Sequence, residues 1–387
     1  MRIAAITGAR SEYGIFRPIL SELNQSEAFE LKLVVSAMHL SRKYGYTVDE
    51  IEADGFHIDA KVPMLEEDSG PLAIARSVGV GTIGFSKVLD DLQPDIVLLI
   101  GDRFEALAAA QAAMLLGIPV AHVHGGELTT HAIDDSIRHA ISKMSHIHFT
   151  STEVYRKRLV QMGEQPNRVF VSGAPALDVI LAEKPLSKKD LERQLEFRFR
   201  DLNFLVTYHS VTAGSDEDDS VGPMLEALKE FDDVGLIVTY PNADQGSDEI
   251  IDALHDFKKN VGERVCLIQS LGQRKYFSAL HYVNAVIGNS SSGLIEVPSF
   301  QIPTINIGKR QGGRIQSESV LNCENVKAGI VKAISNAVEP SFLEVCRTTK
   351  NPYGSGNASK IIAETLGRDD MNRLGVKVFY DLESTEI

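Results

Sequence analysis

Residues 95–124, DIVLLIGDRFEALAAAQAAMLLGIPVAHVH, hold two apolar runs on either side of an alanine-rich segment. The first run, DIVLLIGDR, has the near-continuous apolar character of a strand that is covered on both faces. FEALAAAQAAMLLG has helical composition and ends in Gly117, and PVAHVH is predicted to be the next strand. A strand, a helix and a second strand in this order predict a parallel, doubly wound sheet.

The same alternation continues on both sides of this stretch. Upstream, RIAAITGAR and LKLVVSA are predicted strands, and a second series of strands begins with NFLVTYH after a polar connector. A chain of 387 residues exceeds the roughly 250–300 residues at which single cores stop growing, so we expect an α/β protein with two Rossmann-like domains. We expect the first domain at 1–178, joined by a C-terminal helix at 366–387, and the second at 179–365.

Composition narrows the classes of protein and partner. The chain is 43% hydrophobic and 24% charged, as in a globular protein, and its formal net charge is −14. This charge repels nucleic acid and anionic membranes, so we expect neither as a partner. Three scattered cysteines, and an N-terminus without the pattern of a secretory signal, predict a soluble protein of the reducing cytoplasm.

A glycine turn near the start of the chain has the features of an anion site. TGARSEYG, at 7–14, follows a predicted strand and precedes a predicted helix. Free backbone N–H groups at a helix start attract anions, and the guanidinium of Arg10 would add positive charge. A plain glycine turn with a solvated arginine is the alternative.

A second candidate anion site is IGNSSSGLIEVP, at 287–298. Its three serines offer hydroxyl and N–H groups at the start of a helix, and Glu296 lies where a carboxylate accepts hydrogen bonds from a ribose diol. Serine is also a favoured N-cap residue, but a cap needs only one. The serines are Ser290, Ser291 and Ser292.

Two more polar groups stand at predicted strand ends. Asp102 and Arg103 end the strand quoted first, and His209 ends the first strand of the second domain. Ligands of doubly wound sheets bind beyond the carboxyl ends of the strands, which favours a role in binding. An ion pair and a packed histidine without any such role are the structural alternatives.

Residues 124–139, HGGELTTHAIDDSIRH, gather groups that carry protons beside a pair of glycines. Aspartates favour the first turn of a helix, and charged pairs four apart contribute about 0.2–0.5 kcal/mol, so a solvated helix start explains part of the segment. It does not explain the histidine and glutamate that flank the glycines, which favours a proton-handling site. The candidates are His124, Glu127, Asp134, Asp135, Arg138 and His139.

Histidine pairs invite a test for a metal site. His122 and His124, like His146 and His148, have the spacing that puts both side chains on one face of a strand. Neither pair has an evident third ligand, so we expect no metal and no cofactor.

Together, TGAR, GDRFEALA, HGGE, DDSIRHAISK, YPNADQGS, IGNSSSG and IGKRQGGR resemble the UDP-N-acetylglucosamine 2-epimerase family, and specifically its hydrolysing branch. DDSIRH is the most specific of these motifs. The resemblance implies a GT-B arrangement of two Rossmann-like domains, with the active site in the interdomain cleft, and a homodimer or homotetramer. It also implies a UDP-sugar substrate and UDP as a product.

Carried over by position, the resemblance implies roles for individual residues. The catalytic groups would be Asp102, Asp134 and Glu127, with His209 assisting departure of the diphosphate. The family usually has a glutamate where this chain has His124, so either His124 or Glu127 would take its role. The residues implied to bind UDP are Arg10, Arg103, Asn242, Ser290, Ser291, Ser292, Glu296, Arg310 and Arg314.

The implied reaction converts UDP-GlcNAc and water to N-acetylmannosamine and UDP, the first step of sialic acid biosynthesis. Elimination of UDP would give a 2-acetamidoglucal, which is then hydrated. HGGE is also found in enzymes linked to legionaminic acid, so the same chemistry on UDP-2,4-diacetamido-2,4,6-trideoxyglucose is an alternative. A GT-B glycosyltransferase and a non-catalytic nucleotide-sugar sensor are more distant alternatives, because neither needs the DDSIRH acids.

Overall fold

The structure is a computed structural model that describes residues 1–42, 46–66, 70–129, 133–182, 184–210, 220–241, 247–371 and 374–382. The chain divides into two compact units. The first unit comprises Met1–Glu127, Ile133–Val179 and Tyr353–Ile387, and the second comprises Leu128–Ala132 and Ile180–Pro352.

Within its described residues, the first unit contains a seven-stranded sheet in the order β3-β2-β1-β4-β5-β6-β7. Every neighbouring pair is parallel. The order reverses at β1, whose neighbours are β2 and β4. The strands are β1 (Arg2–Thr7), β2 (Glu30–Ser36), β3 (Ile58–Val62), β4 (Ile96–Ile100), β5 (Val120–Val123), β6 (Ile147–Thr150) and β7 (Val169–Val171).

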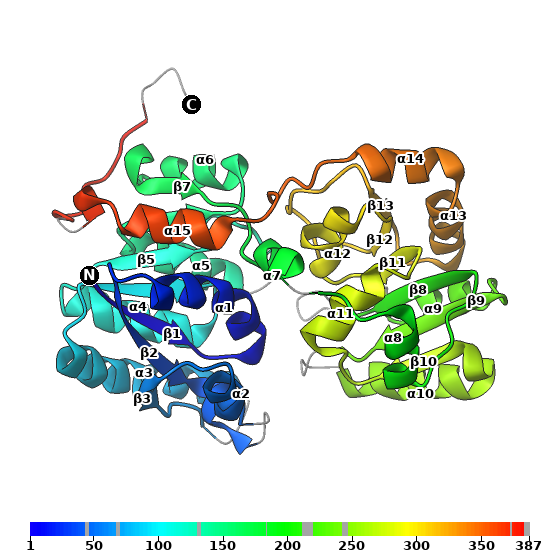
Figure 1. The fold of residues 1–387 in the computed structure, drawn as a ribbon, viewed down its shortest axis with the longest axis horizontal. Helices are drawn as coiled ribbons and strands as arrows, with labels where there is room; N and C mark the ends of the chain where they lie inside the picture. Colours follow the sequence, from blue (N-terminus) through cyan, green and yellow to red (C-terminus); the bar gives the residue numbers. More distant parts are fainter. Residues whose placement is uncertain are drawn as a thin grey trace. The chain divides into compact units, whose positions relative to one another are not determined.

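Helices cover both faces of this sheet (Figure 1). Alternate residues of β1 enter two different cores: Ile3 and Ala5 pack with α1 and α15, whereas Ala4 and Ile6 pack with α3 and α4. The two-sided burial inferred from apolar strands is confirmed. The helices are α1 (Arg10–Gln25), α2 (Val48–Ala53), α3 (Pro71–Leu92), α4 (Phe104–Leu115), α5 (Ile133–Met144), α6 (Glu153–Gln161), α7 (Ala176–Ala182, shared with the second unit) and α15 (Ala358–Leu366).

The alanine-rich sequence of α4 has a packing reason. Its small side chains let α3 approach closely, and a Cβ at Gly81 of α3 would lie 3.1 Å from the Cβ of Ala108. By length and composition alone, α3 is also apolar enough to cross a membrane. Phe85 and Leu89 of this helix are fully buried in the protein core.

Within its described residues, the second unit contains a six-stranded parallel sheet in the order β10-β9-β8-β11-β12-β13. The order reverses at β8. The strands are β8 (Leu202–Thr207), β9 (Val234–Thr239), β10 (Val265–Ile268), β11 (Ala285–Gly288), β12 (Thr304–Ile307) and β13 (Val320–Cys323). The helices are α8 (Lys188–Leu195), α9 (Gly222–Leu228), α10 (Ser247–Val261), α11 (Gly272–Leu280), α12 (Ser292–Ile295), α13 (Lys327–Ala337) and α14 (Pro340–Thr348).

Two expected helices differ in the structure. The helix after the serines is only α12, followed by a 3₁₀ turn at Val297–Phe300, because Pro298 has no N–H with which to continue an α-helix. The helix expected at 366–387 is wrong: α15 ends at Leu366, and described residues 374–382 form no helix. Gly375 and the alternating Val376, Lys377 and Val378 disfavour one.

Gly288 joins β11 to the serine turn in a conformation that only glycine tolerates. Its φ is +138°, and a Cβ there would overlap the carbonyl oxygen of Thr207 on β8. We predict that Gly288→Ala lowers the free energy of unfolding by on the order of 3–5 kcal/mol. Gly272→Ala is the matched control, because Gly272 also has positive φ but nothing within 4 Å of the added Cβ. Urea unfolding measures both, and the control should lose about 1–2 kcal/mol.

Candidate active site

Three neighbouring strands of the first unit deliver most of the candidate groups. Arg10 follows β1 as the first residue of α1, and the loops after β4 and β5 carry Asp102 and His124. The carboxyl ends of these strands lie at one edge of the sheet. The order reverses at β1, so this is the position where doubly wound sheets bind ligands. The placement inferred from strand order is therefore observed.

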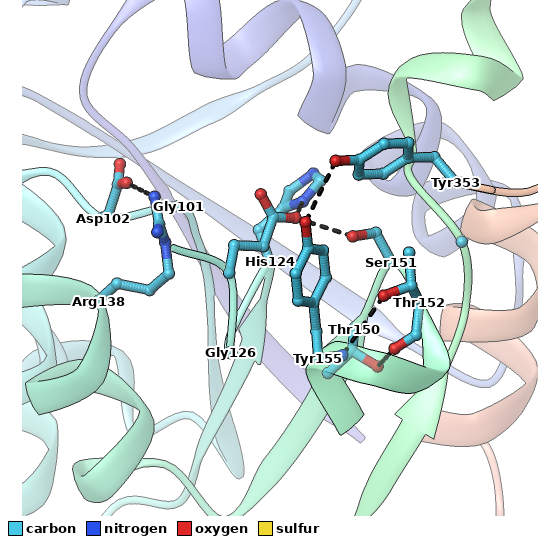
Figure 2. Close-up of polar contacts among 12 residues, drawn as sticks. Gly101, Asp102, His124, Gly126, Arg138, Thr150, Ser151, Thr152, Tyr155 and Tyr353 are labelled. Carbon is cyan, nitrogen blue, oxygen red and sulfur yellow. Dashed lines mark hydrogen bonds and ion pairs between the residues drawn. The ribbon is translucent and has the colours of Figure 1, made fainter. Parts of the chain in front are cut away.

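Asp102 and Arg138 form an ion pair that links the loop after β4 to α5 (Figure 2). Arg138 is only 3% exposed, so its guanidinium needs a carboxylate partner to offset the loss of water. Asp135 contributes a second carboxylate, 3.9 Å from Nη1 of Arg138, and also lies 3.5 Å from Nε2 of His139. The DDSIRH segment thus forms an ion-pair network on one helix, with Asp134 in its first turn.

His124 and Glu127 meet across the two glycines. The Nδ1 of His124 lies 2.7 Å from Oε1 of Glu127, and the hydroxyl of Ser151 donates to the same oxygen at 2.8 Å. A carboxylate facing Nδ1 favours the tautomer in which Nδ1 carries the proton. The Nε2 of His124 is then an acceptor, and it has no hydrogen-bond partner among the described residues.

His122 lies beneath this pair and is structural. Its Nε2 donates to the carbonyl of Gly101 at 2.7 Å, and its Nδ1 lies 3.2 Å from the hydroxyl of Ser142 on α5. Burial lowers the pKa of His122 to about 3, with smaller contributions from its neighbours, so the ring is neutral. It therefore ties the loop after β4 to α5 without carrying a charge.

Arg103 lies beside two buried carboxyl groups. Its Nε pairs with Glu105 at 2.6 Å, and Glu12 of α1 interacts with the same guanidinium. Burial, with a further contribution from the charge of Glu105, raises the pKa of Glu12 to about 8. The carboxyl of Glu12 packs against Gly101, where a Cβ would lie 2.8 Å from its Oε1. The guanidinium of Arg103 thus lies beside two glutamates, and the raised pKa of Glu12 keeps that carboxyl protonated at neutral pH.

Arg10 occupies a more open position. Its side chain is 58% exposed and pairs with Glu50 of α2 at 3.0 Å. An exposed pair of this kind contributes about 0–1 kcal/mol, so an anionic ligand can replace the glutamate at little cost.

In the second unit, Asn289 fixes the position of His209. The side chain of Asn289 accepts from the backbone N–H of His209 at 2.7 Å and donates to its carbonyl at 2.9 Å. The carbonyl of Asn289 in turn accepts from Arg310 at 3.1 Å and from Gln311 at 2.8 Å. Burial, with a further contribution from Arg310, lowers the pKa of His209 to about 4, so its ring is neutral.

The serine turn lies next to this group, after β11. The backbone N–H of Ser292 donates to the hydroxyl of Ser290 at 3.4 Å, and the hydroxyl of Ser292 contacts that of Tyr276. Ser291 is the N-cap of α12 but makes no capping bond through its side chain. Glu296 is the C-cap of α12, and its charge contributes to raising the pKa of the buried Tyr276, after the effect of burial itself.

Arg314 and Asn242 are the remaining candidates. Arg314 follows Arg310 in the turn after β12, where its backbone N–H donates to the carbonyl of Gln311 at 3.3 Å. Asn242, implied to bind UDP, lies outside the described residues. Among the described residues, no three His, Cys, Asp or Glu side chains are arranged to hold a metal ion.

A model of the UDP-N-acetylglucosamine 2-epimerase family matches residues 21–367. The chain belongs to this family. The resemblance drawn from TGAR, HGGE, DDSIRH and IGNSSSG is confirmed, as is the expectation of an enzyme of this type.

Curated relatives and a solved structure agree with this membership. A GDP/UDP-N,N'-diacetylbacillosamine 2-epimerase (hydrolyzing) of Campylobacter jejuni is 36% identical over 324 residues, covering 84% of each chain. A polysialic acid biosynthesis protein of Escherichia coli is 36% identical over 359 residues, covering 92% of this chain and 91% of its own. A UDP-GlcNAc 2-epimerase of Neisseria meningitidis, solved with bound UDP-GlcNAc, has a TM-score of 0.81 at 22% identity, covering 95% of this chain and 99% of its own. The α/β fold is confirmed.

Sequence reasoning missed several residues that hold the candidate groups in place. Glu12 and Asn289 lie inside quoted motifs but carried no assignment, and Ser151 lies outside every motif. Their importance comes from contacts with Gly101, His209 and Glu127 respectively, which join distant parts of the chain. A short polar residue directly after a buried strand was the available signal for Asn289 and Ser151.

We predict that Glu12→Gln makes the stability of the epimerase less sensitive to a rise in pH between 4.5 and about 8. The folded-state pKa of Glu12, about 8, lies above its ordinary value of 4.5, so the folded state binds this proton more tightly. Its contribution to stability is complete below pH 4.5 and is lost as the pH rises towards 8. Glutamine does not titrate, so urea unfolding should show the variant gaining on the wild type by up to about 1.4 kcal/mol per pH unit. Glu22→Gln, on the exposed face of α1, controls for the change in charge; a gain independent of pH would contradict this reasoning.

Proposed function

We propose that this enzyme is a hydrolysing 2-epimerase of a UDP-2-acetamido sugar. The observation that carries the proposal is the arrangement at the ends of β4 and β5. There, His124 is oriented by Glu127, and Asp102 is paired with Arg138. Elimination needs a group that accepts a proton, and hydration needs a group that returns one. A nucleotide-sugar sensor needs neither, and a glycosyltransferase needs no group that returns a proton to carbon.

The first step of the proposed reaction is elimination. A base takes the proton from C2 of the sugar, the electrons of the C–H bond form the C1=C2 double bond, and UDP leaves from C1 with the pair of the C–O bond. The C2 proton is weakly acidic, so positive charge develops at C1 in the transition state. Carboxylates such as Asp102 stabilise such a charge when they are held in place beforehand.

His124 is suited to be the base. Its Nδ1 is bound to Glu127, so Nε2 accepts the proton and the carboxylate stabilises the imidazolium that forms. One oxygen of Glu127 already accepts from both His124 and Ser151, whereas Nε2 of His124 has no hydrogen-bond partner among the described residues. We therefore assign the proton transfer to His124 and an orienting role to Glu127. Of the two alternatives that the sequence left open, we favour His124.

The second step is hydration of the glycal. Water adds its hydroxyl to C1, and C2 receives a proton on the face opposite to the one from which it was removed. A different acid from the base is therefore required. Asp134 stands in the first turn of α5, one helical turn before Arg138, and we assign it this role. Asp102 pairs with Arg138 of the same helix.

We assign the UDP contacts to the second unit. Arg310 and the N–H groups and hydroxyls of Ser290, Ser291 and Ser292 offer a positively charged, hydrogen-bonding surface for a diphosphate. His209 is neutral, so it stabilises the leaving group as a hydrogen-bond donor and not as a cation.

The relatives support two sugars. The Campylobacter relative is named for both the hydrolysing reaction and diacetylbacillosamine, so we favour the UDP-2,4-diacetamido sugar as the substrate. The Escherichia relative, at the same identity, is named for polysialic acid biosynthesis. UDP-GlcNAc, giving N-acetylmannosamine for sialic acid, is therefore the second candidate.

The division of roles between His124 and Glu127 is testable by substitution. His124 has φ +68°, and asparagine tolerates such a backbone, so His124→Asn removes the base without strain. We expect kcat to fall about 10²–10⁴-fold while the Kd for UDP changes less than about twofold. Glu127→Gln keeps an acceptor for Nδ1 and should cost less. His57→Asn, at an exposed loop position, is the control. If Glu127→Gln were the more severe variant, Glu127 and not His124 would be the base.

The substrate and the reaction course can be tested together by NMR. The enzyme is incubated in D₂O with UDP-diacetylbacillosamine and, separately, with UDP-GlcNAc, and the released sugar and UDP are followed. We expect UDP release, an inverted C2 carrying one deuterium, and a larger kcat/KM for the diacetamido sugar. A product without deuterium at C2 would rule out proton abstraction there. A larger kcat/KM for UDP-GlcNAc would assign the enzyme to the second candidate.

A further inference from the structure

The helix that carries Asp134 and Arg138 is held at its other end by the C-terminal segment of the chain. Residues 374–380, called the tail here, pack against the end of α5 and against the turn between α6 and β7. Both contacts lie within the first unit. The proposed reaction makes no direct use of the tail.

Lys377 is the main polar contact of the tail. Its ammonium donates to the carbonyl oxygens of Ser142, Lys143 and Ser145, at 3.2, 2.8 and 2.6 Å. Carbonyl oxygens in the last turn of a helix lack partners within the helix and carry a partial negative charge, so a cation there stabilises the helix end. Lys377 thus satisfies three oxygens at the end of α5.

The same ammonium reaches a buried carboxylate. Glu164 is 2% exposed and pairs with Lys377 at 2.7 Å, with Lys143 at 2.7 Å and with His148 at 2.9 Å. Burial alone would raise the pKa of Glu164, but these three partners lower it to about 2. The carboxylate is therefore ionised and joins α5, β6 and the tail at one point.

Apolar and backbone contacts fix the tail on the C-terminal side of this ion pair. The ring of Phe379 covers Gly163, where any side chain would collide with it, and Nζ of Lys143 lies 5.0 Å from the ring centroid. The N–H of Tyr380 donates to the carbonyl of Gly163 at 2.9 Å. Lys377 is thus held in place from the side that follows it in the chain.

A continuous series of contacts leads from the tail to the candidate catalytic groups. Ser142, whose carbonyl Lys377 binds, uses its hydroxyl to donate to the carbonyl of Arg138 and to contact His122. Arg138 pairs with Asp102, and His122 binds the carbonyl of Gly101. Both routes end at the loop after β4. If the C-terminal end of α5 were free to shift, the contacts along both routes would be disturbed.

We propose that Lys377 is a positioning residue for the proton-transfer site, which keeps Arg138 against Asp102 by holding the end of α5. This inference rests on the proposed function. It makes the tail a working part of the active site, although no residue of the tail touches a reacting group.

The first test separates turnover from binding. In Lys377→Met the aliphatic stem remains while the ammonium is lost. We expect kcat to fall about tenfold, because a small displacement of catalytic groups is costly, and KM to change less than about twofold. Lys360→Met is the matched control, since Lys360 on α15 is 65% exposed and pairs with Glu364 of the same helix at 3.9 Å. Unchanged kcat in Lys377→Met, or a rise in KM alone, would overturn the proposal.

A double-mutant cycle tests the route through Arg138. Arg138→Gln breaks the ion pair with Asp102. If Lys377 acts by placing Arg138, adding Lys377→Met to Arg138→Gln should lower kcat by less than about twofold more. A further tenfold loss in the double variant would show that Lys377 acts by another route.

Amide hydrogen exchange gives a readout that does not depend on activity. Lys377→Met should speed exchange at residues 139–145 and in the loop 101–103, while β8 and β11 of the other unit stay protected. Uniform loss of protection would mean general destabilisation and would overturn a positioning role. Phe379→Ala keeps the charge and loosens only the apolar contact, so it serves if Lys377→Met does not fold; normal exchange and kcat there would count against the proposal. A wild type that releases no UDP would instead contradict the proposed function.

Discussion

The guanidinium of Arg138 is almost completely buried, and the first unit depends on its pairing with Asp102. A buried charge without a partner costs several kcal/mol, so α5 and the loop after β4 are stable only when they meet. The pair joins residues 36 apart in sequence. Gly101 and Arg103 flank Asp102 in the chain. The same contact therefore also positions Glu12, which packs against Gly101, and Glu105, which pairs with Arg103. The candidate active site is therefore built around one ion pair.

Burial determines the charge of several titratable groups in this protein. His122, His209 and Glu12 are held in their neutral forms, since a charged form would lose its water. Glu164 is equally buried but stays ionised, because cations and a histidine surround it. The groups to which we assign proton transfer, His124 and Asp134, are separate from these groups.

Much of the fold, and the strand ends that carry the candidate residues, could be predicted from local pattern. Continuous apolar runs, in place of the apolar–polar alternation of a half-buried strand, predicted a sheet that is covered on both faces. Asp102, His124 and His209 were found because they come directly after such runs. Other features depended on contacts between distant residues. The partners of Arg103 and of Glu127 are examples: Glu105 has no local signal, and the position of Ser151 directly after a strand does not reveal that it binds Glu127. The helix expected at 366–387 failed for a local reason, since Gly375 and the β-branched Val376 and Val378 have low helix propensity.

The sequence by itself determined the order of strands and helices, the family, and which residues follow each strand. These properties follow from short-range periodicity and from motifs, both of which a chain displays without folding. Only the tertiary structure decided that His124 binds Glu127, that Asn289 binds the backbone of His209, and that Lys377 binds carbonyl oxygens at the end of α5. Such pairings depend on hydrogen bonds and burial between segments that lie far apart in the chain. The lowered pKa of His209 likewise arises only once folding has excluded water from its ring.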